Sequence, residues 1–153
     1  MFGRRKTLDE PEINWVRFDV AWGGYYTSRD EDGQWGVFRL LDFNRDAYHS
    51  TLYDQRFPEP PTLEMAKSLT PFALHVPIAA GQLVNFPATL IGESPLALDD
   101  LEGYDVYLEH GAGVGAEERQ AFLTKLVGFG TEPTLAFLLA FDEHGQLQIK
   151  QAE

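Results

Sequence analysis

A glycine-rich segment in the second half of the sequence has the residue types of a phosphate-binding loop. Gly111, Gly113 and Gly115 follow a segment that we predict as a strand, 104–110, and precede a predicted helix, 116–127. Glycines let a backbone approach an anion, and a helix N-terminus offers free N–H donors. The spacing, however, matches neither the dinucleotide-binding fingerprint nor the P-loop, and acids occupy the first helical turn. We therefore expect a turned connector here, and no cofactor.

A serine that follows an apolar stretch partly matches the nucleophile elbow of serine hydrolases. In Gly92-Glu-Ser-Pro-Leu96 the fifth position is not glycine. The residue after the nucleophile must also donate its backbone N–H to the oxyanion, and Pro95 has no N–H. Ser94 is better explained as a helix N-cap with Pro95 at the first helical position. We assign no catalytic residue, and the sequence favours a protein without catalysis over an enzyme.

The four histidines do not have the spacing of a metal site. They are His49, His75, His110 and His144. None forms the pairs or the helical motif typical of zinc ligands. The sequence holds no cysteine, which excludes disulfides and thiolate metal sites. We predict no metal site; His75 is expected in the core or on an edge strand because it lies in an apolar run.

An alternative ligand site is still open at the junction of the predicted strand, loop and helix, 109–115. A small molecule bound there would make this chain a small-molecule-binding domain or a small enzyme. We also expect Tyr25 and Tyr26, which follow a double glycine, at the surface or at the mouth of a cleft. The residues of this alternative site are Tyr25, Tyr26, His110, Gly111, Gly113 and Gly115.

The distribution of charge favours a different role. The formal net charge is −12, and no Lys or Arg occurs between Lys67 and Arg119. A surface built from this segment repels nucleic acids and attracts a basic protein. We expect a binding protein that docks a basic protein partner, such as an inhibitor or immunity-type protein, although the charge could serve solubility alone. The candidate partner-binding acids are Glu93, Asp99, Asp100, Glu102, Asp105, Glu109, Glu117 and Glu118.

Length and composition favour a single α+β domain over residues 1–153, of which 1–12 are expected to form a flexible tail. The start of the chain is basic, but no apolar stretch follows it, so we expect neither a signal peptide nor a membrane segment, and a cytoplasmic location. The pattern does not predict the oligomeric state.

The elements that must position these residues begin with an antiparallel β-hairpin or meander over 14–43, predicted from alternating apolar residues. The segment 47–53 is either a third strand or a short helix, and Tyr48, Thr51 and Tyr53 favour the strand. Prolines predict an extended connector over 57–61, and Thr62 predicts a short helix that ends at Leu69. An edge strand over 73–80 and a second apolar segment over 83–91 follow.

The C-terminal half is predicted as strand, helix, strand, strand. An acidic turn over 98–103, stopped by Gly103, precedes the strand 104–110. The helix 116–127 follows, then a strand over 135–141 buried on both faces, then a strand over 146–151. We expect α+β architecture with a single mixed or antiparallel sheet and few helices.

Overall fold

The computed structural model describes residues 13–129 and 135–152 of the chain; the tail predicted over 1–12 lies outside these ranges. Four strands come first in the described chain, and helical elements then interrupt the remaining strands. The elements are β1 Val16–Val20, β2 Tyr25–Arg29, β3 Trp35–Phe43, β4 Ala47–Leu52, α1 Leu63–Lys67, β5 Ala73–Ala79, α2 Gln82–Asn85, β6 Ala88–Gly92, the 3-10 helix η1 Leu98–Leu101, α3 Glu102–His110, α4 Ala116–Val127, β7 Leu135–Phe141 and β8 Leu147–Gln151.

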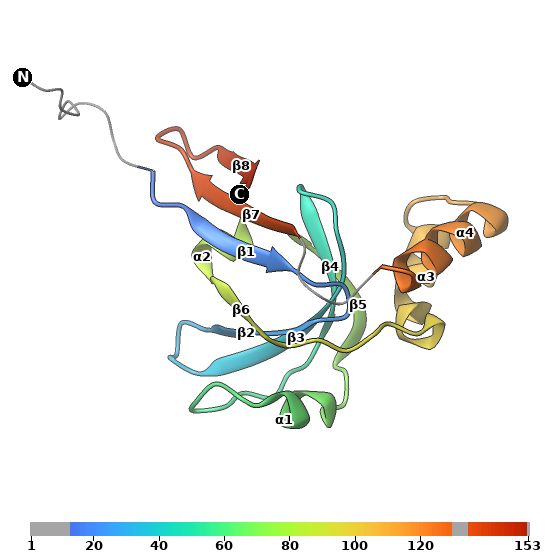
Figure 1. Cartoon of the computed structure of the whole chain (residues 1–153), viewed down its shortest axis with the longest axis horizontal. Coiled ribbons are helices and arrows are strands. Elements are labelled where there is room, and N and C mark those ends of the chain that lie inside the picture. Colours follow the sequence, from blue (N-terminus) through green and yellow to red (C-terminus); the bar gives the residue numbers. More distant parts are fainter. Residues whose placement is uncertain (1–12, 130–134, 153) are drawn as a thin grey trace, which may run out of the picture.

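Within the described ranges the strands form two antiparallel sheets (Figure 1). One has three strands in the order β1-β7-β8, and the other has five in the order β5-β4-β3-β2-β6. The α+β class is therefore confirmed, whereas the expectation of a single sheet is wrong. The reason is β1: the turn at Gly23-Gly24 separates it from β2, and it pairs with β7 from the far end of the chain instead.

The main core lies between the facing sheets. Phe18 of β1 stacks on Tyr26 of β2, with ring centroids 4.9 Å apart, and Phe43 of β3 lies 5.2 Å from Phe137 of β7. The Tyr26 hydroxyl donates to the carbonyl of Asp19 and accepts from the backbone N–H of Ala21, so its burial leaves no polar atom unpaired.

Helices α1, η1, α3 and α4 cover the other face of the five-stranded sheet, which we call the outer face, whereas α2 contacts β1 and β7. Helix α1 packs on Tyr25, Val37 and Tyr53, whereas η1, α3 and α4 pack on Leu41. Figure 1 shows α3 and α4 together at the side of β5. Strand β3 is consequently buried on both faces along most of its length.

Several predicted elements are confirmed. Helix α4 and strand β7 have the predicted bounds, Thr62 caps α1 by accepting from the N–H of Met65, and β5 lies at a sheet edge. The predicted strand 104–110 is wrong, because this segment is helix α3. Its buried residues Tyr104 and Leu108 are four positions apart, and buried Leu101 of η1 lies three positions before Tyr104, which is helical spacing.

Two smaller expectations near this segment are also wrong. Gly103 does not end a turn but lies inside α3, where a side chain would collide with Leu74 of β5. Ser94 does not cap a helix, since η1 begins four residues later. No helix in the described part of the chain is long and apolar enough to cross a bilayer.

Candidate functional site

A cavity of about 550 Å³ lies at the open end of the core. Its lining residues come from β2, β3, β4, β5, α2 and the segments beside them, and none belongs to β1, β7 or β8. This volume lies within the range of small-molecule sites. The lining residues are Ser28, Arg29, Asp30, Gly36, Val37, Phe38, Tyr48, Leu52, Tyr53, Asp54, Arg56, Phe72, Ile78, Gln82 and Phe86.

The floor of the cavity follows from strand pairing. Phe38 of β3 pairs with Leu52 of β4, and Tyr48 of β4 pairs with Ile78 of β5. Side chains of one strand that are an even number of positions apart point to the same face, so Tyr48 and Leu52 both face inward. The rings of Phe38 and Tyr48 lie 5.3 Å apart and belong to both the core and the cavity wall.

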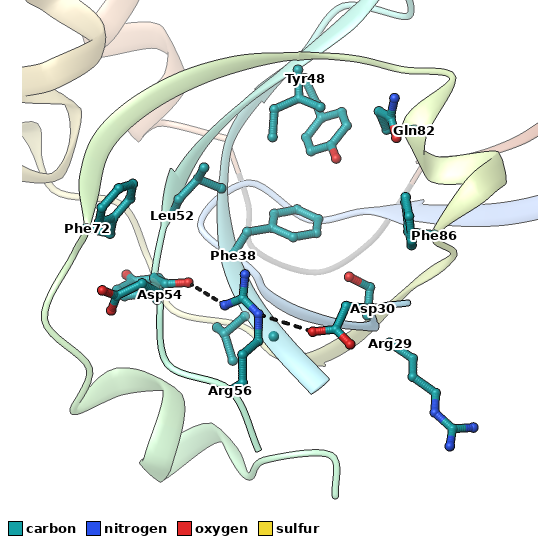
Figure 2. Close-up of a pocket in the computed structure, with 15 residues that line it drawn as sticks. Arg29, Asp30, Phe38, Tyr48, Leu52, Asp54, Arg56, Phe72, Gln82 and Phe86 are labelled. Atoms are coloured by element: carbon teal, nitrogen blue, oxygen red, sulfur yellow. Dashed lines mark hydrogen bonds and ion pairs between the residues drawn. The ribbon is translucent and has the colours of Figure 1, made fainter. Parts of the chain in front are cut away.

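Two aromatic side chains border the opening. Phe72, directly before β5, is 70% exposed, and Phe86 follows α2. Figure 2 shows them on opposite sides of the cavity, with Phe38 and Leu52 between them. An exposed phenylalanine contributes little to the core, so Phe72 is available for contact with a bound apolar group.

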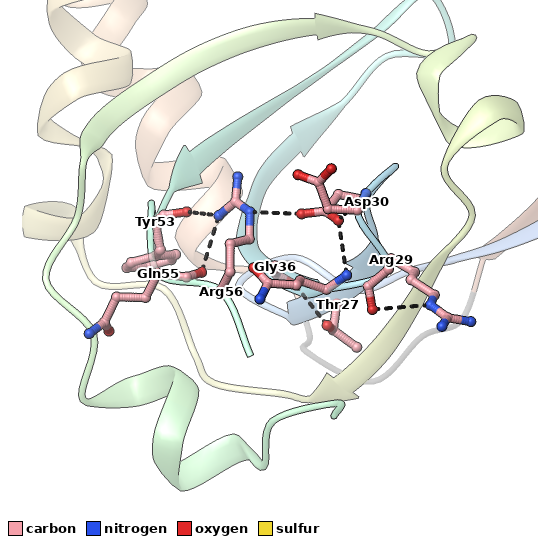
Figure 3. A network of polar contacts seen from close by, with 10 residues as sticks. Thr27, Arg29, Asp30, Gly36, Tyr53, Gln55 and Arg56 are labelled. Atoms are coloured by element: carbon pink, nitrogen blue, oxygen red, sulfur yellow. Dashed lines mark hydrogen bonds and ion pairs between the residues drawn. The ribbon is translucent and has the colours of Figure 1, made fainter. Parts of the chain in front are cut away.

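Arg56 is the fixed polar group of the cavity. Its Nη1 donates to the carbonyls of Tyr53 and Gln55 at 3.0 and 3.1 Å, and its Nε lies 3.4 Å from Oδ2 of Asp30 (Figure 3). Asp30 is held in turn, since its Oδ1 accepts from two backbone N–H groups of the β2–β3 loop. The guanidinium lies over Gly36, where a Cβ would be 3.3 Å from three of its atoms.

The opposite part of the cavity carries a hydroxyl. The ring of Tyr48 points toward Phe38 and Phe86 in Figure 2, and its hydroxyl makes no hydrogen bond to the described residues. Burial raises the pKa of Tyr48 to about 12, so the hydroxyl keeps its proton at neutral pH. It is therefore a hydrogen-bond donor that is free for a ligand.

A second group of polar side chains lies under α3, on the outer face. His49 and His75 approach through Nδ1 and Nε2 at 2.8 Å, and both rings stack on Tyr104. The hydroxyl of Tyr104 donates to Oδ2 of Asp42 at 2.8 Å, and the indole of Trp22 donates to Oδ1 of Asp42 at 3.3 Å.

This stack is poorly suited to catalysis near neutral pH. Burial lowers the pKa of His49, and burial together with the neighbouring His49 lowers the pKa of His75 to about 4. An efficient general base has a pKa near the working pH, whereas both imidazoles stay neutral and weakly basic there. The stack packs α3 against β4 and β5. His75 thus lies on an edge strand, which is one of the two positions predicted for it.

The structure divides the eight candidate acids into two groups. Asp100 and Asp105 are engaged inside the molecule: Asp100 lies 3.1 Å from the guanidinium of buried Arg39, and Asp105 lies 2.7 Å from Arg119. Six others are exposed, with Glu109 also 3.9 Å from Arg119. The exposed acids are Glu93, Asp99, Glu102, Glu109, Glu117 and Glu118.

Some of these acids share a second hollow of about 360 Å³ between η1, α3 and α4. Asp99, Glu102 and Asp105 line it together with Arg119, and Leu98 borders it with 55% of its surface exposed. The remaining candidate acids do not line this hollow. Three of the eight candidate acids, Asp99, Glu102 and Asp105, are thus brought together at one hollow.

The structure does not bring together the residues of the alternative ligand site. His110 and the glycines at 111, 113 and 115 are exposed between α3 and α4, and none lines either hollow. Tyr25 and Tyr26 are 6% and 0% exposed, so the expectation that they lie at a surface or cleft mouth is wrong. Tyr25 packs under α1 and Tyr26 lies between the sheets.

No pattern in the sequence indicates the cavity. Its floor comes from three strands, and its polar end combines Asp30 of the β2–β3 loop with Arg56 of the segment after β4. No spacing in the sequence relates these residues. The only local signal is Phe72, a large apolar residue directly after Pro71 and before an edge strand.

Among the described residues, no three His, Asp or Glu side chains are grouped as metal ligands would be. The chain matches no protein-family model, and comparisons with curated proteins and with solved structures return no significant match.

Proposed function

We propose that the protein is a non-catalytic binding protein that holds a small amphipathic molecule in the cavity at the open end of its core. The observation that carries this proposal is the combination of an apolar floor, an exposed Phe72 and two fixed polar groups, Arg56 and Tyr48, that retain unused donors. Ligand sites are typically apolar hollows with a few placed polar groups.

Binding is favoured over reaction because the cavity lacks an activated acid–base pair. The carboxylate of Asp30 is occupied by Arg56 and by two backbone N–H groups, and Tyr48 holds its proton to about pH 12. Catalytic proton transfer needs groups that change protonation near the working pH.

The test is titration of the purified chain with N-phenyl-1-naphthylamine, an uncharged probe whose fluorescence rises in apolar surroundings. We expect saturable binding at one site. Leu52→Trp, which fills the cavity floor, abolishes it, whereas Val106→Trp on the exposed side of α3 leaves it unchanged. Equal binding by both variants, each folded by circular dichroism, would refute the proposal.

A second candidate is docking of a basic protein partner, in the manner of an inhibitor or immunity-type protein. The specific observation that favours it is the hollow lined by Asp99, Glu102 and Asp105 beside exposed Leu98. Such a site attracts a basic partner most strongly at low ionic strength.

The acids that are changed to test this docking site must not be ones that stabilise the fold. Asp100 pairs with buried Arg39 and is therefore left intact, while Asp99 and Glu102 are both changed to Lys. The control, Glu31→Lys with Glu143→Lys, has the same net charge. We expect a basic protein to be retained from lysate at low salt by the wild type and the control but not by the Asp99/Glu102 variant. Equal retention by all three proteins excludes this hollow as the docking site.

A further inference from the structure

We propose a chemical class for the cavity's ligand: an uncharged, mainly apolar molecule that carries a carbonyl-type hydrogen-bond acceptor directed at Arg56. This inference rests on the cavity function proposed above and adds the charge, the acceptor and the orientation of the bound molecule. It is carried by three observations: how Arg56 is held, how the charges around it balance, and what the walls offer.

The guanidinium of Arg56 is positioned before any ligand arrives. Nη1 and Nε are occupied by the carbonyls of Tyr53 and Gln55 and by the carboxylate of Asp30, while Nη2 makes no hydrogen bond to the described residues. Figure 2 shows a guanidinium nitrogen that no dashed line joins, pointing toward the ring of Phe38, into the cavity. A donor fixed in this way recognises an acceptor without first losing side-chain freedom.

The charges at this end of the cavity compensate one another. Arg29 and Arg56 carry two positive charges, and Asp30 and Asp54 carry two negative charges, so the formal sum is zero. The Arg29 side chain is also turned to its own loop, where Nε donates to the carbonyl of Gly33. An anion would meet Asp30 as well as Arg56, and therefore gains little over a neutral acceptor such as a ketone, ester or amide.

The rest of the cavity fits an apolar and preferably flat body. Rings of Phe38, Phe72 and Phe86 surround the space, and Leu52 and Ile78 complete the floor. Aromatic walls favour offset stacking on a planar ligand. The Tyr48 hydroxyl can donate to a second acceptor on the body, remote from Arg56.

Three ligands of nearly equal shape test separately whether the cavity prefers a hydrogen-bond acceptor and whether it prefers a negative charge. 2-Acetylnaphthalene has a carbonyl and no charge, 2-ethylnaphthalene has no acceptor, and 2-naphthoate has a charged carboxylate. Each is competed against N-phenyl-1-naphthylamine on the full chain. Because a hydrogen bond to a charged donor is strong, we expect the acetyl compound to bind about tenfold more tightly than the ethyl compound. The naphthoate should bind no more tightly than the acetyl compound.

Two variants assign the selectivity to Arg56. Arg56→Met removes the donor and keeps an apolar stem, and it should reduce the acetyl-to-ethyl ratio to about one. Gly36→Ala places a Cβ 3.3 Å from the guanidinium and should lower the ratio while the charge is kept. This second variant covers the case in which Arg56→Met disturbs the segment after β4.

The outcomes are distinct. Equal affinity for the acetyl and ethyl compounds, or much tighter binding of the naphthoate, overturns the proposed ligand class but leaves a functional cavity. A wild-type selectivity that survives in both variants shows that Arg56 is not the recognising group, and also overturns the inference. Binding of none of the compounds, including the probe, refutes the cavity function itself.

Discussion

Replacing Tyr104 by Phe tests how α3 is attached to the outer face of the sheet. Tyr104 is 3% exposed, and its hydroxyl donates to Oδ2 of Asp42 at 2.8 Å. The substitution removes one oxygen and keeps the ring that stacks on His49 and His75. The change is therefore confined to the hydrogen bond.

The expected magnitude follows from the partners that Asp42 retains. A hydrogen bond to a charged group contributes about 1.5–3 kcal/mol, and the loss is largest when the partner is left unpaired. Asp42 keeps the hydrogen bonds from the indole of Trp22 and the backbone N–H of Phe43, but both go to Oδ1, so Oδ2 is left with no partner among the described residues. We therefore expect the upper part of the range, about 2–3 kcal/mol of the free energy of unfolding.

Urea unfolding followed by circular dichroism measures this loss. With a typical denaturant dependence, about 2 kcal/mol lowers the midpoint by about 1 M urea. Tyr107→Phe is the matched control, because it lies in the same helix and stack and its hydroxyl makes no hydrogen bond to the described residues. We expect that control within about 0.5 kcal/mol of wild type. Equal losses in the two variants would refute the reasoning.

Three further predictions concern other parts of the molecule. Gly23→Ala should destabilise by about 3 kcal/mol or more in the same assay, because φ is +83° and a Cβ would lie 2.1 Å from the Ser94 carbonyl. The free energy of unfolding should fall as the pH is lowered from 6.5 to about 4, because His75 takes up a proton in this range when unfolded but not in the native state. His75→Gln should make this fall, measured from urea midpoints, smaller. Phe72→Ala should leave the melting temperature nearly unchanged and weaken binding of N-phenyl-1-naphthylamine, since Phe72 is 70% exposed.

Local patterns in the sequence predict those elements whose environment is simple. Helix α4 has one apolar stripe and glycines at both ends, and β7 has a continuous apolar run. The segment of α3 has a pattern that is typical of a strand, because Tyr104, Val106 and Leu108 recur at every second position. Only the packing of Tyr104 and Leu108 against Leu41, with Val106 half exposed, shows that the three-and-four spacing is the relevant one.

The functional residues depend on contacts that no local pattern records. The composition of the sequence is enough to predict an acidic segment. It does not predict that Asp100 pairs with Arg39, because the two residues meet only in the folded protein. Nothing in the local sequence distinguishes Arg56 from the rest of its polar segment. Its position in the cavity depends on contacts with Gly36 and Asp30, which are distant in sequence. Sequence therefore indicated the fold class and the unusual charge, and the cavity came from tertiary structure alone.

The pairing of β1 with β7 has a consequence for synthesis on the ribosome. Val16 to Val20 leave the ribosome long before their partners, Leu135 to Leu139, are made. The five-stranded sheet can pair as soon as residue 92 has emerged, so its inner face, with Tyr26 and Phe38, remains without its covering sheet while the remaining segments are translated. A nascent chain halted before β7 thus presents apolar surface that a chaperone can bind, and formation of the β7–β8 hairpin and its pairing with β1 ends that exposure.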